Sequence, residues 1–271
     1  PSAGPLAHLI DVWHCAAPSV DFIAPDLYDD GFKGWTAQYH LHNNPLFIPE
    51  IRHTQNNGVR AFYVFGEHNA LGFSPFAIED GSDEQGTPFV EGYEKLREIM
   101  PLVTGWQGKD AMWGLLFDQN DKERIIEDGS LVLTCRHNFT LPWDPRATDG
   151  SVWPEGGGII IRIAENEYIV AGNGIVVEFA TASEKAFGKA AESLGEDGFA
   201  SAGSKGTGTP GRKAWKGTRC GIGSVDEVKV NADGSFSYIR RLNGDQDHQG
   251  RHVRISVGDY KTLYVRLYEY Q

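Results

Sequence analysis

One carboxylate, Glu50, follows a short apolar run in a way that could support chemistry. Four of the residues from Leu46 to Ile51 are apolar, and an Asn-Asn pair precedes them as a turn signal. Such a run predicts a buried strand. A charged carboxylate is costly in a dry environment, so we expect Glu50 where the strand emerges. Barrels of alternating strands and helices keep their catalytic residues there, although an ion pair with Arg52 or Arg60 would explain the same pattern.

The neighbouring segments predict the elements that position this carboxylate. Residues 20–28 form a second strand-like segment that also ends in polar groups, and residues 70–78 form a third. Residues 31–43 carry apolar side chains at roughly helical spacing, and a further apolar segment follows at 59–65. Strand, helix, strand, helix and strand with short connections is the pattern of parallel βαβ units.

The remainder of the chain divides into two helices and a long β-rich region. We expect an amphipathic helix at 6–15 and a helix from Thr87 to about Val103. Beyond it the apolar period changes towards two, with strand-like runs at 112–117, 130–135, 158–163, 168–170, 175–179, 225–230, 236–239, 252–257 and 262–268. Many short strands separated by turn signals predict a β-sandwich over 106–271. A Gly-, Ser- and Lys-rich loop is expected near 195–220, after a short helix at 183–194.

Composition excludes several classes of protein. Of the 271 residues, 40% are hydrophobic and 11% aromatic, which excludes general disorder. The formal net charge of −12 argues against a nucleic-acid partner, because phosphates would repel it. There is no apolar run of the length of a membrane span, so we expect no membrane partner. Three distant cysteines, Cys15, Cys135 and Cys220, make neither a disulfide framework nor a metal motif, and they leave the cellular compartment open.

Three blocks of this sequence resemble a known family. The blocks DFIAPDLY, NNPLFIPEIRH and AFYVFGEHNALGFSPFAIED are similar to the second half of the catalytic barrel of bacterial family 35 glycoside hydrolases. The later run RRLNGDQDHQGRHVRI resembles the β-rich C-terminal domain of this β-galactosidase-like group. The resemblance implies that residues 1–105 supply strands six to eight of a (β/α)8 TIM barrel. Residues 106–271 would then form the β-sandwich accessory domain.

The same resemblance assigns roles to the residues near Glu50. Glu50 falls on the position of the catalytic nucleophile, at the end of strand seven, and Tyr28 on that of a tyrosine that hydrogen-bonds it. The residues expected to contact substrate are Asp26, Tyr28, Arg52, Phe73 and Phe76. Alternatives stay open for each of them: Tyr28, Phe73 and Phe76 would also suit packing, Asp26 a structural partner, and Arg52 a subunit contact. No metal and no organic cofactor is implied.

A retaining glycosidase needs a second carboxyl group, and none in this chain fits. In the family the acid/base follows an Asn at the end of strand four, and strands one to five are not in this sequence. Asn166–Glu167 resembles that motif superficially, but it lies between strand-like runs and predicts a hairpin turn. Glu67 is the rival functional carboxylate, but it precedes its strand, which favours a structural role. We therefore expect the N-terminal half of the barrel to be supplied as another polypeptide.

The expected activity is that of a retaining β-glycosidase. By resemblance it would be an exo-acting β-galactosidase on plant-type oligosaccharides, active only with the missing half. The substrate would be a β-galactoside or a related oligosaccharide, and a periplasmic or secreted location is favoured. The class is often dimeric or larger, so a homo-oligomer is one expected assembly. The alternative is a non-catalytic carbohydrate-binding or scaffold protein that kept the barrel and lost the chemistry.

Overall fold

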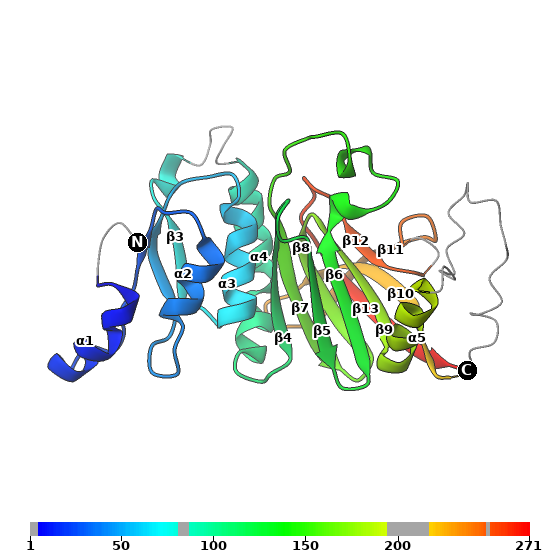
Figure 1. The fold of residues 1–271 in the computed structure, drawn as a ribbon, viewed down its shortest axis with the longest axis horizontal. Helices are drawn as coiled ribbons and strands as arrows, with labels where there is room; N and C mark the ends of the chain where they lie inside the picture. Colours follow the sequence, from blue (N-terminus) through cyan, green and yellow to red (C-terminus); the bar gives the residue numbers. More distant parts are fainter. Residues whose placement is uncertain (1–4, 81–86, 194–216, 248–249) are drawn as a thin grey trace.

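The computed structural model describes residues 5–80, 87–193, 217–247 and 250–271 (Figure 1). Its first sheet has three parallel strands in the order β1-β2-β3, namely β1 (Asp26–Leu27), β2 (Phe47–Ile51) and β3 (Gly72–Pro75). Helix α2 (Phe32–Tyr39) connects the first pair and α3 (Asn57–His68) the second. The predicted alternation of strand, helix, strand, helix and strand is therefore present.

The first of these strands is much shorter than the sequence predicts. We expected a strand over 20–28, but only Asp26 and Leu27 pair with a neighbour. Upstream, the side chain of Asn44 takes the place of a strand: its Oδ1 accepts from Ile23 N at 2.7 Å and its Nδ2 donates to Ile23 O at 3.0 Å. Asn44 is fully buried. Because a side chain satisfies the backbone of Ile23, this segment stays extended without joining the sheet.

Helices precede and follow the parallel sheet along the chain. The chain begins with a 3-10 turn at Ala7–Leu9 and α1 (Ile10–Ala16), which projects away from the rest of the molecule in Figure 1. After β3, a 3-10 turn at Ile78–Asp80 precedes α4 (Thr87–Trp106). Among the described residues, none of the helices is both long enough and apolar enough to cross a membrane.

The second half of the chain forms two antiparallel sheets. The six-stranded sheet has the order β11-β10-β13-β8-β7-β4 and the four-stranded sheet the order β12-β9-β6-β5. The strands are β4 (Met112–Phe117), β5 (Glu123–Asp128), β6 (Leu131–His137), β7 (Gly156–Ala164), β8 (Glu167–Asn173), β9 (Ile175–Thr181), β10 (Arg219–Val230), β11 (Phe236–Arg241), β12 (Val253–Ile255) and β13 (Lys261–Tyr270). Two 3-10 turns (Asn138–Thr140, Pro145–Ala147) and α5 (Ala182–Ser193) complete the described elements. Most of the predicted Gly-, Ser- and Lys-rich loop, residues 194–216, lies outside the described residues.

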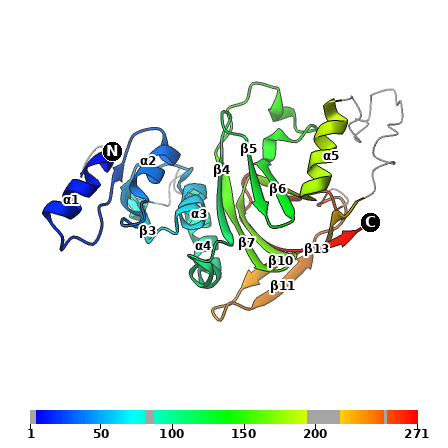
Figure 2. The same ribbon diagram turned by 60° about the horizontal axis from the view of Figure 1, so that its bottom comes forward.

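Two apolar clusters hold these layers together. One lies between the two antiparallel sheets and includes Leu115, Leu133, Val177 and Val265. The other joins the opposite face of the six-stranded sheet to α3, α4 and the parallel sheet. Figure 2 shows α3 and α4 between the two halves of the molecule, beside β4 and β7. The β-rich half is thus built directly onto the helices of the first half.

A close backbone approach at a glycine, together with ion pairs, fixes the junction between the two halves. Helix α3 approaches β4 so closely that a Cβ added to Gly114 would lie 2.3 Å from the carbonyl oxygen of Tyr63. Three ion pairs also cross the junction: Lys33–Asp121 at 2.6 Å, Arg60–Glu155 at 2.6 Å and Arg124–Glu67 at 2.5 Å. Shape and charge therefore both specify how the halves are placed.

Candidate functional site

Two carboxyl side chains, Asp26 and Glu50, come together on neighbouring parallel strands. In the β1–β2 pairing Asp26 is the register partner of Glu50, and Leu27 that of Ile51. Leu27 and Ile51 are buried in the cluster shared with the helices. Because side chains alternate along a strand, Asp26 and Tyr28 lie on the other face from Leu27.

Tyr28 and Glu50 are joined on that face. The phenol hydroxyl of Tyr28 donates a hydrogen bond to Oε1 of Glu50. This bond is the largest cause of the raised pKa of Tyr28, about 12, with desolvation and the charge of Glu50 adding to it. A donor held against a carboxylate favours its ionised form. The contact that the sequence resemblance implied is therefore present, and it orients the side chain of Glu50.

Asp26 differs from Glu50 in its electrostatic environment. Its pKa is raised from the usual 3.8, first by burial and then by the negative charge of Glu50. Two interacting carboxyl groups with different surroundings are a common arrangement for acid–base and nucleophilic chemistry. Here the pair can provide one anion and one group that takes up a proton more readily than usual.

Arg52 and Phe76 lie beside this pair. The backbone N–H of Arg52 donates to Leu27 O at 3.0 Å, and its guanidinium donates to the carbonyl oxygen of Tyr28. Phe76 follows β3 and donates its N–H to Ile51 O at 2.8 Å, while 56% of its surface stays exposed. Arg52 and Phe76 are therefore at the rim, as expected of residues that could contact a ligand.

The fifth predicted ligand contact, Phe73, is not brought together with the others. Only 6% of its surface is exposed. Its ring packs edge-on against Phe32, with ring centroids 6.2 Å apart, and at a tilt against Tyr93, with centroids 6.5 Å apart. These partners belong to α2 and α4, so Phe73 faces the helices and not the side of Asp26 and Tyr28. The sequence was consistent with either substrate contact or packing for Phe73, and the structure shows packing.

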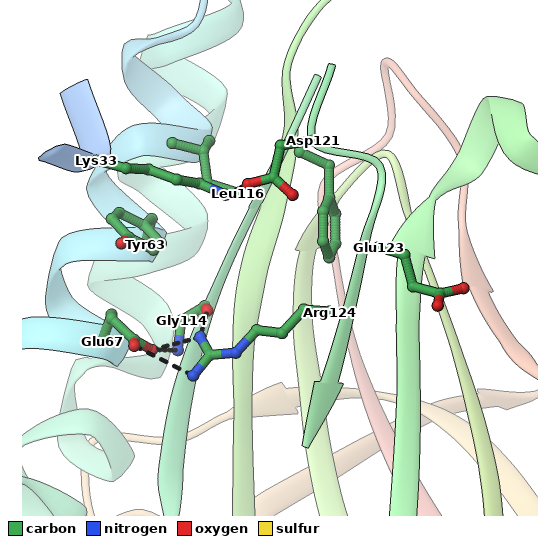
Figure 3. Close-up of a pocket in the computed structure, with 9 residues that line it drawn as sticks. Lys33, Tyr63, Glu67, Gly114, Leu116, Asp121, Glu123 and Arg124 are labelled. Carbon is green, nitrogen blue, oxygen red and sulfur yellow. Dashed lines mark hydrogen bonds and ion pairs between the residues drawn. The ribbon is translucent and has the colours of Figure 1, made fainter. Parts of the chain in front are cut away.

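Glu67, the rival carboxylate, is engaged elsewhere. It lies in the last turn of α3, where Arg124 of β5 binds both of its oxygens at 2.5 and 3.1 Å. These two residues line an open pocket of about 240 Å³ together with Lys33, Tyr63 and Asp121 (Figure 3). Figure 3 shows charged side chains from the helices and from the β-sheet edge pointing towards each other across it. The charges of Lys33 and Glu67 are both taken up by partners across the junction, which fits a brace better than a reactive centre.

Other sequence motifs have structural explanations. Residues 165–166 form the turn between β7 and β8, with Asn166 at φ 59°, so the predicted hairpin is confirmed. Trp153 is buried and stacks on His137 at 4.9 Å, which makes it a packing anchor. All three cysteines are free thiols. Within the described part of the chain no group of three or more His, Cys, Asp or Glu side chains is placed to hold a metal ion.

The sequence did not indicate the residues that support the site from behind. Asn57 is fully buried at the start of α3 and donates through Nδ2 to Arg52 O at 3.0 Å. Glu155 of the β-rich half binds Arg60 of the same helix. The position of Asn57, shortly after the loop that follows Glu50, could have indicated a supporting role for this residue. The choice of Glu155 as a partner for Arg60 depends on tertiary packing.

Comparison with known proteins places the second half of this chain in a family. No curated protein matches the sequence. A family described as "Domain of unknown function (DUF5597)" matches residues 89–254, from the first turns of α4 to β12. The match covers more than half of the 271 residues, and the chain therefore belongs to the DUF5597 family.

Proposed function

We propose that this chain is the C-terminal part of a retaining β-glycosidase, an exo-acting β-galactosidase on plant-type oligosaccharides. The observation that carries the proposal is the hydrogen bond from Tyr28 to Glu50 at the C-terminal ends of two parallel strands. Catalytic groups of (β/α) barrels lie at that end. The resemblance to family 35 glycoside hydrolases supplies the substrate class.

In the proposed reaction Glu50 acts as the carboxylate nucleophile. One of its oxygens forms a bond to the anomeric carbon as the glycosidic bond breaks, and the leaving oxygen takes a proton from a second carboxylic acid. That acid, now a carboxylate, removes a proton from water, whose oxygen displaces Glu50 and releases the sugar with net retention. Tyr28 orients the Glu50 carboxylate through its hydrogen bond, and Arg52, Asp26 and Phe76 would contact the sugar.

The second carboxyl group would come from the rest of a barrel. Parallel sheets are normally covered on both faces. Among the described residues, however, the helices cover only one face of β1-β2-β3, and β1 and β3 each pair with β2 alone. Large apolar side chains are also exposed along this first part of the chain, namely Leu6, Leu9, Val12, Trp13, Val20, Leu41, Leu71, Phe76, Ile78 and Val90. We propose that strands one to five, on this or another polypeptide, cover that face and bring the acid/base to Glu50.

In this proposal the three parallel strands are strands six to eight of a TIM barrel. The two antiparallel sheets, with their shared apolar cluster, would be the β-sandwich accessory domain, and its role would be to buttress the barrel. The direct packing of β4 and β7 on α3 supports such a role.

The proposal is tested with the enzyme assembled from this chain and the upstream barrel half. We expect it to hydrolyse a nitrophenyl β-galactoside, and the isolated 271-residue chain to be inactive. Glu50→Gln should lower kcat by several orders of magnitude, and azide should rescue Glu50→Gly by attacking in place of the carboxylate. Glu67→Gln is the control and should keep its activity. Near-normal rates in Glu50→Gln would contradict the proposal. So would an assembled enzyme that binds galactosides but hydrolyses none, as the non-catalytic alternative requires.

A further inference from the structure

The loop that follows Glu50 is held from the β-rich half of the molecule. Glu155 precedes β7, within the DUF5597 match, and its carboxylate accepts two hydrogen bonds from Arg60 of α3, at 2.7 and 2.6 Å. Its backbone N–H donates to Oδ1 of Asn56 at 3.3 Å. Paired bonds between a guanidinium and a carboxylate fix direction as well as distance. The start of α3 is thereby tied to the β-rich half by three hydrogen bonds from one residue.

From the start of α3 the contacts continue to the candidate nucleophile. Asn57, fully buried, donates to Arg52 O at 3.0 Å, and its Oδ1 accepts from the hydroxyl of Thr54 at 3.2 Å. Arg52 in turn donates to the carbonyl oxygen of Tyr28. Tyr28 hydrogen-bonds Glu50. Polar contacts therefore lead from Glu155 to Asn56 and, across the peptide bond from Asn56 to Asn57, onward through Arg52 and Tyr28 to Glu50.

A second branch reaches the loop that follows β1. The guanidinium of Arg60 lies 5.1 Å from the ring centroid of Phe32, at the start of α2. Phe32 comes shortly after Tyr28 in the chain. Arg60 belongs to α3 and also contacts α2, and the residues of the candidate site lie before these two helices. Glu155 fixes the orientation of Arg60.

Glu155 is itself on a rigid support. The carbonyl oxygen of the preceding Pro154 accepts a hydrogen bond from Nε2 of His137 at 3.0 Å. Nδ1 of the same ring accepts from Phe139 N at 3.0 Å, so His137 is neutral with its proton on Nε2. The ring of Trp153 stacks on His137, and its Nε1 donates to Arg146 O at 2.9 Å. The segment 153–155 is therefore anchored in the β-rich half before it reaches Arg60.

We propose that Glu155 is a positioning residue through which the DUF5597 region sets the loop 52–57 and, with it, the placement of Glu50 and Tyr28. The catalytic consequence rests on the proposed glycosidase function, whereas the mechanical one does not. Enzymes depend strongly on such placement, because a small displacement of reacting groups lowers kcat without removing any group that touches the substrate. The β-rich half then contributes to turnover through Glu155 without any need for this residue to contact the sugar.

The first experiment measures backbone amide hydrogen exchange in the 271-residue chain. Glu155→Gln keeps the shape of the side chain and weakens the pairing with Arg60. We expect exchange of peptides covering 52–57 to become about tenfold faster or more, with the global unfolding midpoint little changed. Glu67→Gln is the matched control, because Glu67 also binds an arginine through both oxygens across the same junction, at the other end of α3. It should leave exchange of 52–57 unchanged.

The second experiment measures kinetics in the enzyme assembled with the upstream barrel half. We expect Glu155→Gln to lower kcat about 10- to 100-fold with KM nearly unchanged, and Arg60→Met to add little to it in the double variant. Unchanged exchange of 52–57 in Glu155→Gln would overturn the inference, and so would faster exchange with unchanged kcat. Faster exchange in a wild-type assembly that hydrolyses no glycoside would instead overturn the glycosidase proposal and leave the positioning contact established.

Discussion

Asp26 and Glu50 are register partners on adjacent parallel strands, and only one of the two carboxyl groups is held by a tyrosine. Tyr28 donates to Glu50, whereas Asp26 is affected by burial and by the charge of Glu50, which raise its pKa. The two carboxyl groups at this edge of the sheet thus have different surroundings. Tyr28 and Asp26 can therefore be substituted one at a time.

Replacing Tyr28 with Phe should lower kcat, because it removes the hydrogen bond to Glu50. The variant loses the donor that favours the carboxylate, so we expect kcat in the assembled enzyme to fall about 10- to 100-fold. The comparison with wild type is made over the full pH–rate profile. The control is Tyr264→Phe, since Tyr264 makes a similar bond to Glu167 at 2.6 Å in the β-rich half. Equal profiles for wild type and Tyr28→Phe would show that the bond has no role in turnover.

Replacing Asp26 with Asn should stabilise the fold at neutral pH. The folded-state pKa of Asp26 is above its unfolded value of 3.8, so ionised Asp26 destabilises the folded state as pH rises through the raised pKa. We expect the urea midpoint of Asp26→Asn to exceed that of wild type near neutral pH, and the difference to vanish below pH 3.8. A lower midpoint at neutral pH would mean that the Asp26 carboxylate is a net stabilising partner.

Acid should destabilise the protein through His68. Its Nδ1 lies 3.0 Å from Nδ1 of His40, and burial, followed by the charge of His40, lowers its pKa from 6.5 to about 4. The unfolded state binds a proton between these values and the folded state does not, so stability falls as pH drops from 6.5 to 4, by on the order of 3 kcal/mol. His68→Phe should flatten the dependence of the unfolding midpoint on pH in this window, while a change at exposed His42 should not. An unaltered slope in His68→Phe would assign the acid sensitivity to other groups.

The close approach of α3 to β4 makes Gly114 intolerant of a side chain. A Cβ there would lie 2.3 Å from the carbonyl oxygen of Tyr63 and 2.7 Å from the backbone nitrogen of Glu67. We expect Gly114→Ala to lower the free energy of unfolding by about 1–3 kcal/mol or more. Gly105→Ala is the control: no atom lies within 4 Å of its added Cβ, and alanine in a helix is favoured by about 0.5–1 kcal/mol. Urea denaturation of both variants checks the contrast, which fails if the two midpoints move together.

Local patterns were sufficient to predict most elements. The run 112–117 coincides with β4, and the alternating runs of the β-rich half each contain or overlap an observed strand. β5 was missed because charged side chains occupy most of it. One of them, Asp128, is buried, accepts a hydrogen bond from the hydroxyl of Tyr168 at 2.8 Å and forms an ion pair with Arg162 at 2.8 Å. Such a pairing depends on tertiary contacts, and the hydrophobic pattern of the strand does not contain it.

In the candidate site, too, some residues could be predicted from the sequence and others could not. The βαβ pattern predicted that Tyr28 and Glu50 end two strand-like segments, and the resemblance to family 35 glycoside hydrolases implied the contact between them. The aromatic side chain of Phe73 had two uses consistent with the sequence, and its register opposite buried Ile48 decides for packing. Glu155 could not be predicted, because its partner Arg60 is set by how the antiparallel sheets dock on α3.

The central claim is that Glu50 is the nucleophile of a retaining β-glycosidase, and trapping the covalent intermediate tests it most directly. The assembled enzyme would be incubated with an activated 2-deoxy-2-fluoro-β-galactoside, digested with a protease and analysed by mass spectrometry. We predict one fluorosugar per chain, attached to the side chain of Glu50, and no labelling of the Glu50→Gln variant. A label on a different carboxylate, or a wild-type enzyme that turns over galactosides without ever being labelled, would contradict the account.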